Sequence, residues 1–309
     1  MTGKSTQQDA GTALRKTAKK LFAEKAVDIV IGYRNGSLPD TARPFFARNA
    51  EDADNLVWNR FCSGNLAALL PRLFEKPQKP REGYKPPRVA IVAKGCDARS
   101  VAGLVKEKQV ARENVVIIGM PCEGMLAAPK EGAAAGELLR ACAECVSPEV
   151  IQADITIEGR SRKGAKPSYS RVKAFEKKSA AERWRIFTEE ISRCIRCNAC
   201  REACPNCYCK VCFVDQRKPA WVSPAARLSE TMVYHIGRMF HQAGRCVECD
   251  ACVNACPMGI DLRLFTQKLA TDAFELFECI PGVSGDEVPP LQMFKQDDSE
   301  CFITDPEEQ

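Results

Sequence analysis

The chain has 309 residues, of which 45% are hydrophobic and 28% are charged, and this balance is typical of a globular protein with about two domains. The apolar runs stop far short of the roughly 18 residues that a membrane-spanning helix needs, and no apolar leader follows the polar first residues, so we expect a cytoplasmic protein without membrane insertion. The net charge is +5, but residues 158–185 alone carry ten lysines or arginines against three glutamates, so the charge does not indicate a nucleic-acid partner.

The first half of the chain alternates between helical and strand patterns, from which we predict an α/β domain over residues 1–156. Some segments repeat apolar residues at helical spacing, whereas others are short continuous apolar runs that suit buried strands. The predicted helices are 12–25, 100–108 and 134–143, and the predicted strands are 27–31, 88–93, 114–118 and 150–157. The strand–helix–strand order implies a small sheet that contains parallel strands joined by a right-handed crossover, with 150–157 at its edge.

The second half is expected to be mainly α-helical. Residues 157–185 are predicted to be a basic, solvated linker with a lead-in helix from Ser170, and docking on an acidic partner is the alternative. Residues 186–278 contain helical patterns at 224–241 and 261–277, the second with one apolar face. An irregular tail follows at 279–309, and we expect it to wrap a neighbouring surface.

Eighteen cysteines are the most informative feature of the composition, because disulfides do not persist in a reducing compartment and thiols in such numbers usually bind metal. Two runs share the spacing C-x2-C-x2-C-x3-C-P, one ending at Pro205 and the other at Pro257. This spacing binds [4Fe–4S] clusters, and the fourth cysteine of each run ligates the other cluster in two-cluster proteins. The first cluster is therefore predicted on Cys194, Cys197, Cys200 and Cys256, and the second on Cys246, Cys249, Cys252 and Cys204.

The residues between these cysteines suit a chain that wraps a cluster. Asn198 and Asp250 follow the second cysteine of each run and tolerate the left-handed backbone that a tight turn requires. Zinc is the alternative metal, but it would need only four cysteines arranged as two pairs. Arginines outnumber acidic residues around the first run and not around the second, so we expect the first cluster to have the higher reduction potential.

A third cluster is predicted in the α/β domain. Cys96 and Cys122 each come shortly after a predicted strand, and the carboxyl ends of neighbouring parallel strands meet at one edge of a sheet. A C-x2-C pair follows further along the chain. We therefore predict a third [4Fe–4S] cluster on Cys96, Cys122, Cys142 and Cys145, with Cys62 as a spare candidate and with buried free thiols as the alternative.

The remaining candidates have weaker patterns. We expect three thiols to pack beside the first cluster, or to hold a further cluster if Cys62, Cys279 or a non-cysteine residue completes it; these are Cys207, Cys209 and Cys212. We place His235 on the helix surface and His241 beside the second cluster, and we assign no role to Cys301. No G-x-G-x-x-G follows a strand and no G-x-x-x-x-G-K occurs, so a hydrolase or a nucleoside-triphosphate enzyme is not indicated.

Two resemblances add to this interpretation. Residues 190–260 resemble the α-helical ferredoxin modules of anaerobic oxidoreductases. The segments 89–97, 117–124 and 142–145 resemble the β-subunit family of deazaflavin-dependent hydrogenases and formate dehydrogenases, in which a Pro-Cys after a strand and a later C-x2-C help to bind a [4Fe–4S] cluster beside a flavin. The resemblance implies this role for Cys122, Cys142 and Cys145, whereas Cys96 is our own inference for the fourth ligand.

The expected function is electron transfer. We expect an iron–sulfur subunit of an anaerobic oxidoreductase complex of the formate dehydrogenase, hydrogenase or heterodisulfide-reductase kind, with partner subunits that carry flavin, molybdenum or tungsten, or hydrogenase centres and with catalysis elsewhere. One alternative is a flavin-bearing subunit that itself oxidises or reduces a nicotinamide or a deazaflavin. The flavin-binding Gly-Gly-x-x-Thr stretch of the family is replaced here by Gly32 to Pro39, so FAD stays an alternative cofactor. The other alternative is a cluster-bearing sensor or scaffold.

Overall fold

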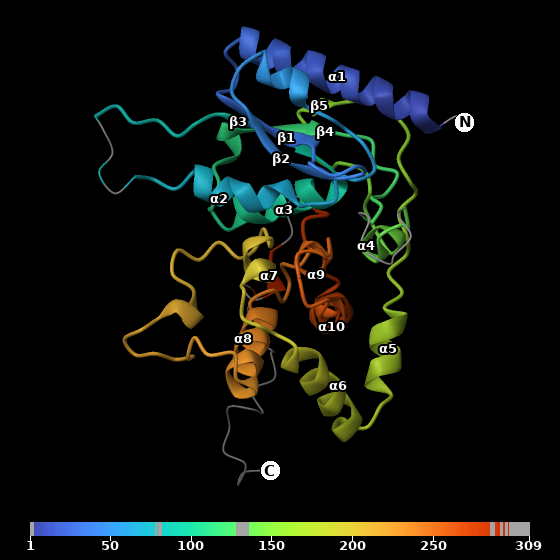
Figure 1. Cartoon of the computed structure of the whole chain (residues 1–309), viewed down its shortest axis with the longest axis vertical. Coiled ribbons are helices and arrows are strands. Elements are labelled where there is room, and N and C mark those ends of the chain that lie inside the picture. Colours follow the sequence, from blue (N-terminus) through green and yellow to red (C-terminus); the bar gives the residue numbers. More distant parts are fainter. Residues whose placement is uncertain are drawn as a thin grey trace.

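The computed structural model describes residues 3–77, 79, 82–127, 136–284, 288–290, 293 and 296. These residues form a five-stranded mixed sheet with a helical half packed beside it (Figure 1). The strand order is β2-β1-β3-β4-β5, and only β2 runs antiparallel to its neighbour. The strands are β1 (Ile29–Asn35), β2 (Ala42–Ala47), β3 (Val89–Ala93), β4 (Val115–Gly119) and β5 (Ile155–Thr156).

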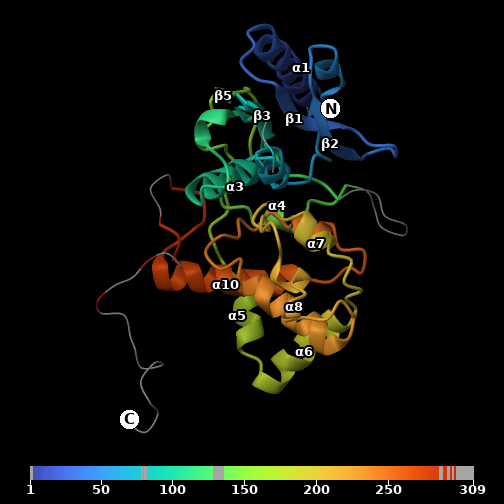
Figure 2. The same cartoon turned by 90° about the vertical axis from the view of Figure 1, so that its left-hand side faces the viewer.

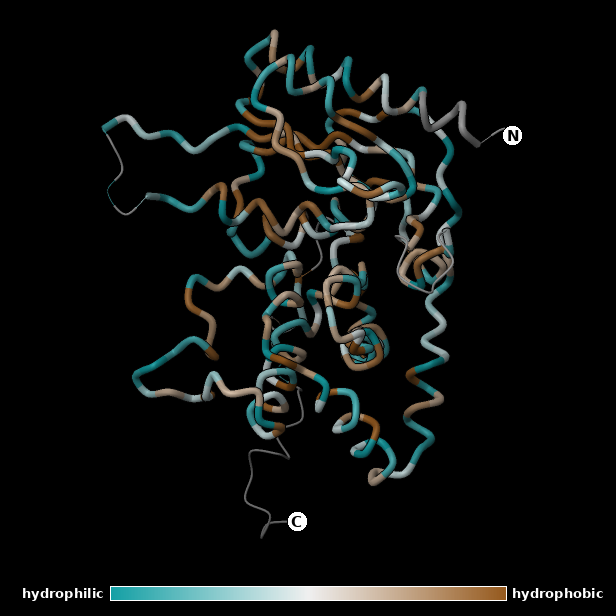
Figure 3. The backbone as a smooth tube through the Cα atoms, in the orientation of Figure 1, coloured by the Kyte–Doolittle hydropathy of each residue, from teal (hydrophilic) through white to brown (hydrophobic). Residues whose placement is uncertain are grey.

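The centre of the sheet is the predicted strand–helix–strand unit of β3, α3 (Gly95–Lys106) and β4. All of β3 is buried, as expected for a parallel strand that is covered on both faces. Figures 1 and 2 show α1 (Gly3–Ala23) on one side of the sheet and α3 on the other, and Figure 3 shows the apolar residues concentrated in the strands between them. Ala93 pairs with Gly119, so β3 and β4 end level and the segments that follow them leave the same edge of the sheet.

Several predicted bounds in this half were wrong. The first helix begins at Gly3 rather than at residue 12, and α3 begins at Gly95 rather than at Ser100, which places Cys96 in the first turn of a helix. The edge strand β2 was missed because Pro44 interrupts its pattern, although proline is tolerated on an edge strand. The helix expected at 134–143 is the single turn α4 (Arg140–Ala143), and residues 134 and 135 lie outside the described residues. The predicted edge position of β5 is confirmed.

The second half is helical, as predicted. The basic segment is irregular up to Tyr169 and then forms α5 (Ser170–Glu176) and α6 (Ala180–Ser192), the latter with a reciprocal Ser179–Glu182 cap. Its other helices are α7 (Ala199–Glu202), α8 (Leu228–Phe240), α9 (Ala251–Asn254) and α10 (Leu262–Phe277). The short helical turns of the chain are η1 (Asp52–Asn55), η2 (Leu66–Leu69), α2 (Leu70–Leu73), η3 (Arg112–Asn114) and η4 (Phe213–Asp215).

The two halves share a side-chain interface. Figures 1 and 2 show the helical half on the side of the sheet that carries α3. The described start of the tail packs on this same helix, since the Arg99 guanidinium donates to the Pro281 carbonyl at 2.8 Å. The tail therefore contacts its own chain; Cys301 lies outside the described residues. Across the described ranges, no helix is both long and apolar enough to cross a membrane.

Candidate metal centres

The first predicted set of cysteines lies around one pocket. Cys194, Cys197, Cys200 and Cys256 all line it, so the fourth thiol comes from the second run, as the spacing predicts. Burial raises the pKa of the Cys194 thiol, and the other three thiols of the set add to this rise. The pocket reaches the surface, because Cys197 is exposed and the neighbouring Ile195 is 54% exposed.

The second predicted set is also gathered, in a more buried place. Burial raises the pKa of Cys249 to about 11 and that of Cys252 to about 12, and the nearby Cys204 thiol adds to both shifts. Burial likewise raises the pKa of Cys246, with contributions from Cys252 and Cys249. Cys204 therefore lies near Cys249 and Cys252 although it belongs to the first run. Within the described residues, no three His, Cys, Asp or Glu side chains converge tightly enough to hold a single metal ion.

The backbone of the two runs repeats the same turn. Asn198 and Asp250 have φ values of 62° and 56°, so the predicted left-handed residues are confirmed. The sequence did not reveal a second left-handed residue in each run, which is Arg196 in the first and Glu248 in the second. Two such residues reverse the chain within one cysteine triplet and start α7 and α9 directly behind it. The two runs therefore share one local backbone conformation, a tight turn followed by a short helix.

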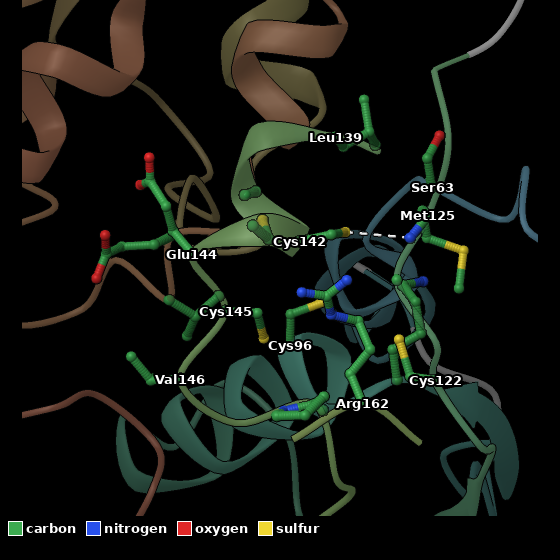
Figure 4. A pocket seen from close by; sticks show the side chains of 18 of the residues that line it. Ser63, Cys96, Cys122, Met125, Leu139, Cys142, Glu144, Cys145, Val146 and Arg162 are labelled. Carbon is green, nitrogen blue, oxygen red and sulfur yellow. Dashed lines mark hydrogen bonds between the residues drawn. The ribbon is translucent and has the colours of Figure 1, made fainter. Parts of the chain in front are cut away.

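The third predicted set lies at the sheet edge. Cys96, Cys122, Cys142 and Cys145 line one pocket, and Figure 4 shows them around it with Arg162 among them. The backbone N–H of Met125 donates to Cys142 Sγ at 3.2 Å. Cys249 of the second set lines the same pocket, so the second and third sets adjoin. The spare candidate, Cys62, does not line it and is instead buried in the core of the α/β half.

A glycine permits the close approach that assembles this third set. A side-chain carbon at Gly95 would lie 2.1 Å from the Ser147 carbonyl oxygen, which belongs to the loop directly after Cys145. Any larger residue would push this loop away from the helix that carries Cys96. The requirement for glycine is local, but its neighbour lies about fifty residues further along the chain. Reasoning from the sequence alone therefore missed it.

A buried ion pair holds the start of α3. The Lys94 ammonium lies 2.8 Å from the Asp97 carboxylate, and it also donates to the Tyr33 hydroxyl and to the Gly64 carbonyl. Asp97 in turn accepts from the backbone N–H groups of Lys94 and Leu66. Because a buried charge is tolerated when it is paired and hydrogen-bonded, this network fixes the turn that presents Cys96. The sequence analysis did not single out either residue.

A second charged network joins α10 to the second and third sets. Arg263 is 2% exposed in its side chain and contacts three carboxylates, those of Glu144, Glu248 and Asp250. Glu144 lies between Cys142 and Cys145, whereas Glu248 and Asp250 flank Cys249. Arg263 therefore ties the loops of both sets to one helix.

The histidine predictions were wrong. His235 is 1% exposed rather than on the surface, and its Nε2 lies 3.2 Å from Cys194 Sγ. Burial and the charges of Arg238 and Arg196 lower the pKa of His235 to about 3, so the ring is neutral and donates to this sulfur in the tautomer that carries hydrogen on Nε2. His241 is exposed and packs edge-on against Phe213.

The buried group beside the second set is Gln242, not His241. Its side-chain oxygen lies 3.5 Å from Cys204 Sγ, and its nitrogen donates to Cys207 Sγ at 3.6 Å. Periodicity could have found His235, because it lies on the face of α8 that also carries Tyr234 and Arg238, and Gln242 follows two residues after the end of this helix.

The unassigned thiols of the second half do not share one environment. Cys207, Cys209 and Cys212 line a cleft of about 610 Å³ together with Cys204. Cys207 lies against Cys204, whereas Cys212 contacts Arg201 and Cys209 is exposed. Cys279 is buried.

Comparison with known proteins gives a distant full-length relative. No protein-family model matches the chain. The chain is similar to the F420-dependent formate dehydrogenase subunit beta of Methanocaldococcus jannaschii, with 21% identity over 374 aligned positions that cover 92% of this chain and 94% of the relative. The similarity therefore spans both the sheet and the helical half, and it supports the predicted resemblance to β subunits of this kind.

Proposed function

We propose that the chain is an iron–sulfur electron-transfer subunit of an oxidoreductase complex, and that it holds three [4Fe–4S] clusters. The observation that carries this proposal is that twelve cysteines lie in three groups of four, of which the second and third adjoin at Cys249. When bound, such clusters supply one-electron transfer at potentials set by the surrounding charges and hydrogen bonds.

The three sets lie in an order that gives electrons a path through the protein. Cys249 of the second set lines the pocket of the third set, and Arg238 lies near Cys252 and Cys204 of the second set while its Nη2 donates to the carbonyl of Cys200 in the first set. The order is therefore third, second, first, and it ends at the exposed Cys197. His235 and the Met125 backbone donate to the ligand sulfurs Cys194 and Cys142, which stabilises negative charge there.

The similarity to a β subunit suggests that this chain also has partner subunits. A β subunit of an F420-dependent formate dehydrogenase works beside other subunits, and we propose that this chain also passes electrons between partners that carry a flavin or a molybdenum or tungsten centre. Oxidation or reduction of the substrate then takes place on those partners, in a cytoplasmic, anaerobic setting.

The decisive experiment is the metal content of the full chain reconstituted without air. We expect about twelve irons and as many sulfides per chain. Four or fewer irons, or stoichiometric zinc, would contradict the proposal. The Cys62→Ser variant is the matched control, because Cys62 is a buried cysteine outside all three groups and its loss should leave the iron content unchanged.

A second candidate is a subunit that itself exchanges electrons with a deazaflavin through a bound flavin. The name of the relative favours it, because that protein is F420-dependent. Flavin released in stoichiometric amount when the purified protein is denatured would support this candidate. Flavin-free protein with a full complement of iron would leave electron transfer as the whole function.

A further inference from the structure

Arg238 on α8 is a buried cation with unused hydrogen-bonding groups. Its side chain is only 4% exposed, and its Nη2 donates to the Cys200 carbonyl at 3.0 Å. Its Nε and Nη1 are closed to solvent and make no well-aligned hydrogen bond to a described residue, although the Cys207 thiol lies beside the guanidinium. A buried guanidinium in this state is costly, so it indicates an electronegative partner at this place.

The groups around this guanidinium are thiols rather than carboxylates. The thiols whose charges act on it are Cys252 and Cys204 of the second set, Cys200 of the first set, and Cys207, which belongs to neither set. Among the described residues, no carboxylate forms an ion pair with Arg238, although Arg263 near the second set has three. Arg238 therefore lies between the two sets and faces both.

We propose that Arg238 is a shared positioning residue for the first two clusters, whose free N–H groups hydrogen-bond to sulfur and whose charge stabilises the reduced state of both. This inference rests on the proposed function. Each cluster gains one electron and one negative charge on reduction, and two such charges repel each other in a low-dielectric interior. A cation between them weakens this repulsion, so the second electron enters at a potential closer to that of the first.

The position of Arg238 between the first two sets predicts that their electron donor is a two-electron donor. Because Arg238 narrows the interval between the two potentials, the pair can take both electrons from a two-electron donor in two consecutive one-electron steps. Neither cluster then holds its electron so tightly that transfer onward stops. Arg238 would thus allow two one-electron clusters to accept together the two electrons that a partner releases in one reaction.

The test is an EPR-monitored redox titration of the full reconstituted chain with dithionite as the reductant. In Arg238→Met we expect the midpoints of the first and second clusters both to fall and the interval between them to widen, while the third midpoint stays fixed. Arg238→Lys keeps the charge without the planar fork, and it should restore most of the interval. Arg196→Met is the matched comparison, because Arg196 belongs to the first run and lies over the Tyr234 ring, so its loss should lower the first midpoint alone.

The outcomes separate this inference from the proposed function. Absence of iron in the unaltered chain would refute the proposed function itself. Clusters in Arg238→Met with unchanged midpoints would overturn the role of Arg238, and so would loss of iron from both Arg238 variants, which would mark the residue as purely structural. Cys207 is the neighbouring thiol outside both sets, so an equal change of both midpoints in Cys207→Ser would assign the partner of Arg238 to that thiol instead.

Discussion

The two cysteine runs have the same spacing and the same left-handed turns, yet their surroundings differ. The first set opens to the surface at Cys197 and Ile195. The second set is enclosed between the two halves, where burial raises the pKa of Cys246, Cys249 and Cys252, and a hydrogen bond with Cys207 together with burial raises that of Cys204. One motif thus produces two kinds of site, because the spacing determines the turn whereas the packing around it determines the dielectric environment and the access.

This difference leaves the expected order of the two reduction potentials unchanged, but it changes the physical reason for that order. Arg193 is paired with Glu190 and Arg201 with Asp215, so two of the three arginines near the first run are neutralised. Burial disfavours the extra negative charge of a reduced cluster more strongly at the enclosed second set. We still expect the first cluster to have the higher potential, but mainly because it is more exposed.

The largest expected effect tests whether each run supplies its fourth cysteine to the cluster of the other run. Cys204 belongs to the first run, but Cys204→Ser should remove the second cluster; Cys256 belongs to the second run, but Cys256→Ser should remove the first. Each variant should lose about four irons and one EPR signal. Cys209→Ser, an exposed cysteine near the same turns, is the control. Loss of the signal of its own run in either variant would show that the thiols are not crossed.

The third set can be compared with the other two in the same way. Cys145→Ser should lower the iron content by about four per chain and leave both ferredoxin-type signals in place. The full chain is needed, because Glu248, Cys249 and Arg263 from the helical half form part of the pocket wall. If Cys145→Ser retains all its iron, these cysteines are buried free thiols.

Arg263→Met tests the contact between the second and third sets. Removing this buried cation leaves Glu144, Glu248 and Asp250 without their counter-ion, and breaking such a pair costs about 3–5 kcal/mol. The concentration of guanidinium chloride at which half of the cluster-loaded protein is unfolded should therefore fall. Arg185→Met breaks an exposed pair with Glu189 and should cost about 0–1 kcal/mol. Equal midpoints for the two variants would show that the Arg263 network does not join the halves.

The smallest expected effect concerns charge at the first set. Arg196→Glu should lower the first midpoint and leave the second nearly unchanged, because residue 196 lies between Cys194 and Cys197 of the first set and the change replaces a positive by a negative charge there. Solvent screening keeps this shift small. The paired Arg193 is the matched comparison, and Arg193→Gln should move the first midpoint less. If Arg196→Glu moves neither midpoint, burial alone separates the clusters.

Much of the candidate site follows from local sequence. The spacing of each run, the left-handed Asn198 and Asp250, and the parallel β3–α3–β4 unit all depend on residues close together in the chain, so their geometry can be inferred without a fold. The third set stays a prediction, and the structure shows that level parallel strands bring Cys96 and Cys122 to one edge, where both line a pocket with Cys142 and Cys145.

The residues that surround the thiols could not be predicted in this way. His235, Arg238 and Arg263 occupy helix faces that look ordinary in the sequence, and only packing brings them to cysteines on other elements. The same holds for Gly95, whose neighbour is a distant loop. The sequence by itself determined the backbone turn of each cysteine run, since that depends on short-range spacing and on left-handed residues within the run. The tertiary structure decided how buried each site is and which charge faces it, because burial and electrostatic environment depend on segments that lie far apart in the chain.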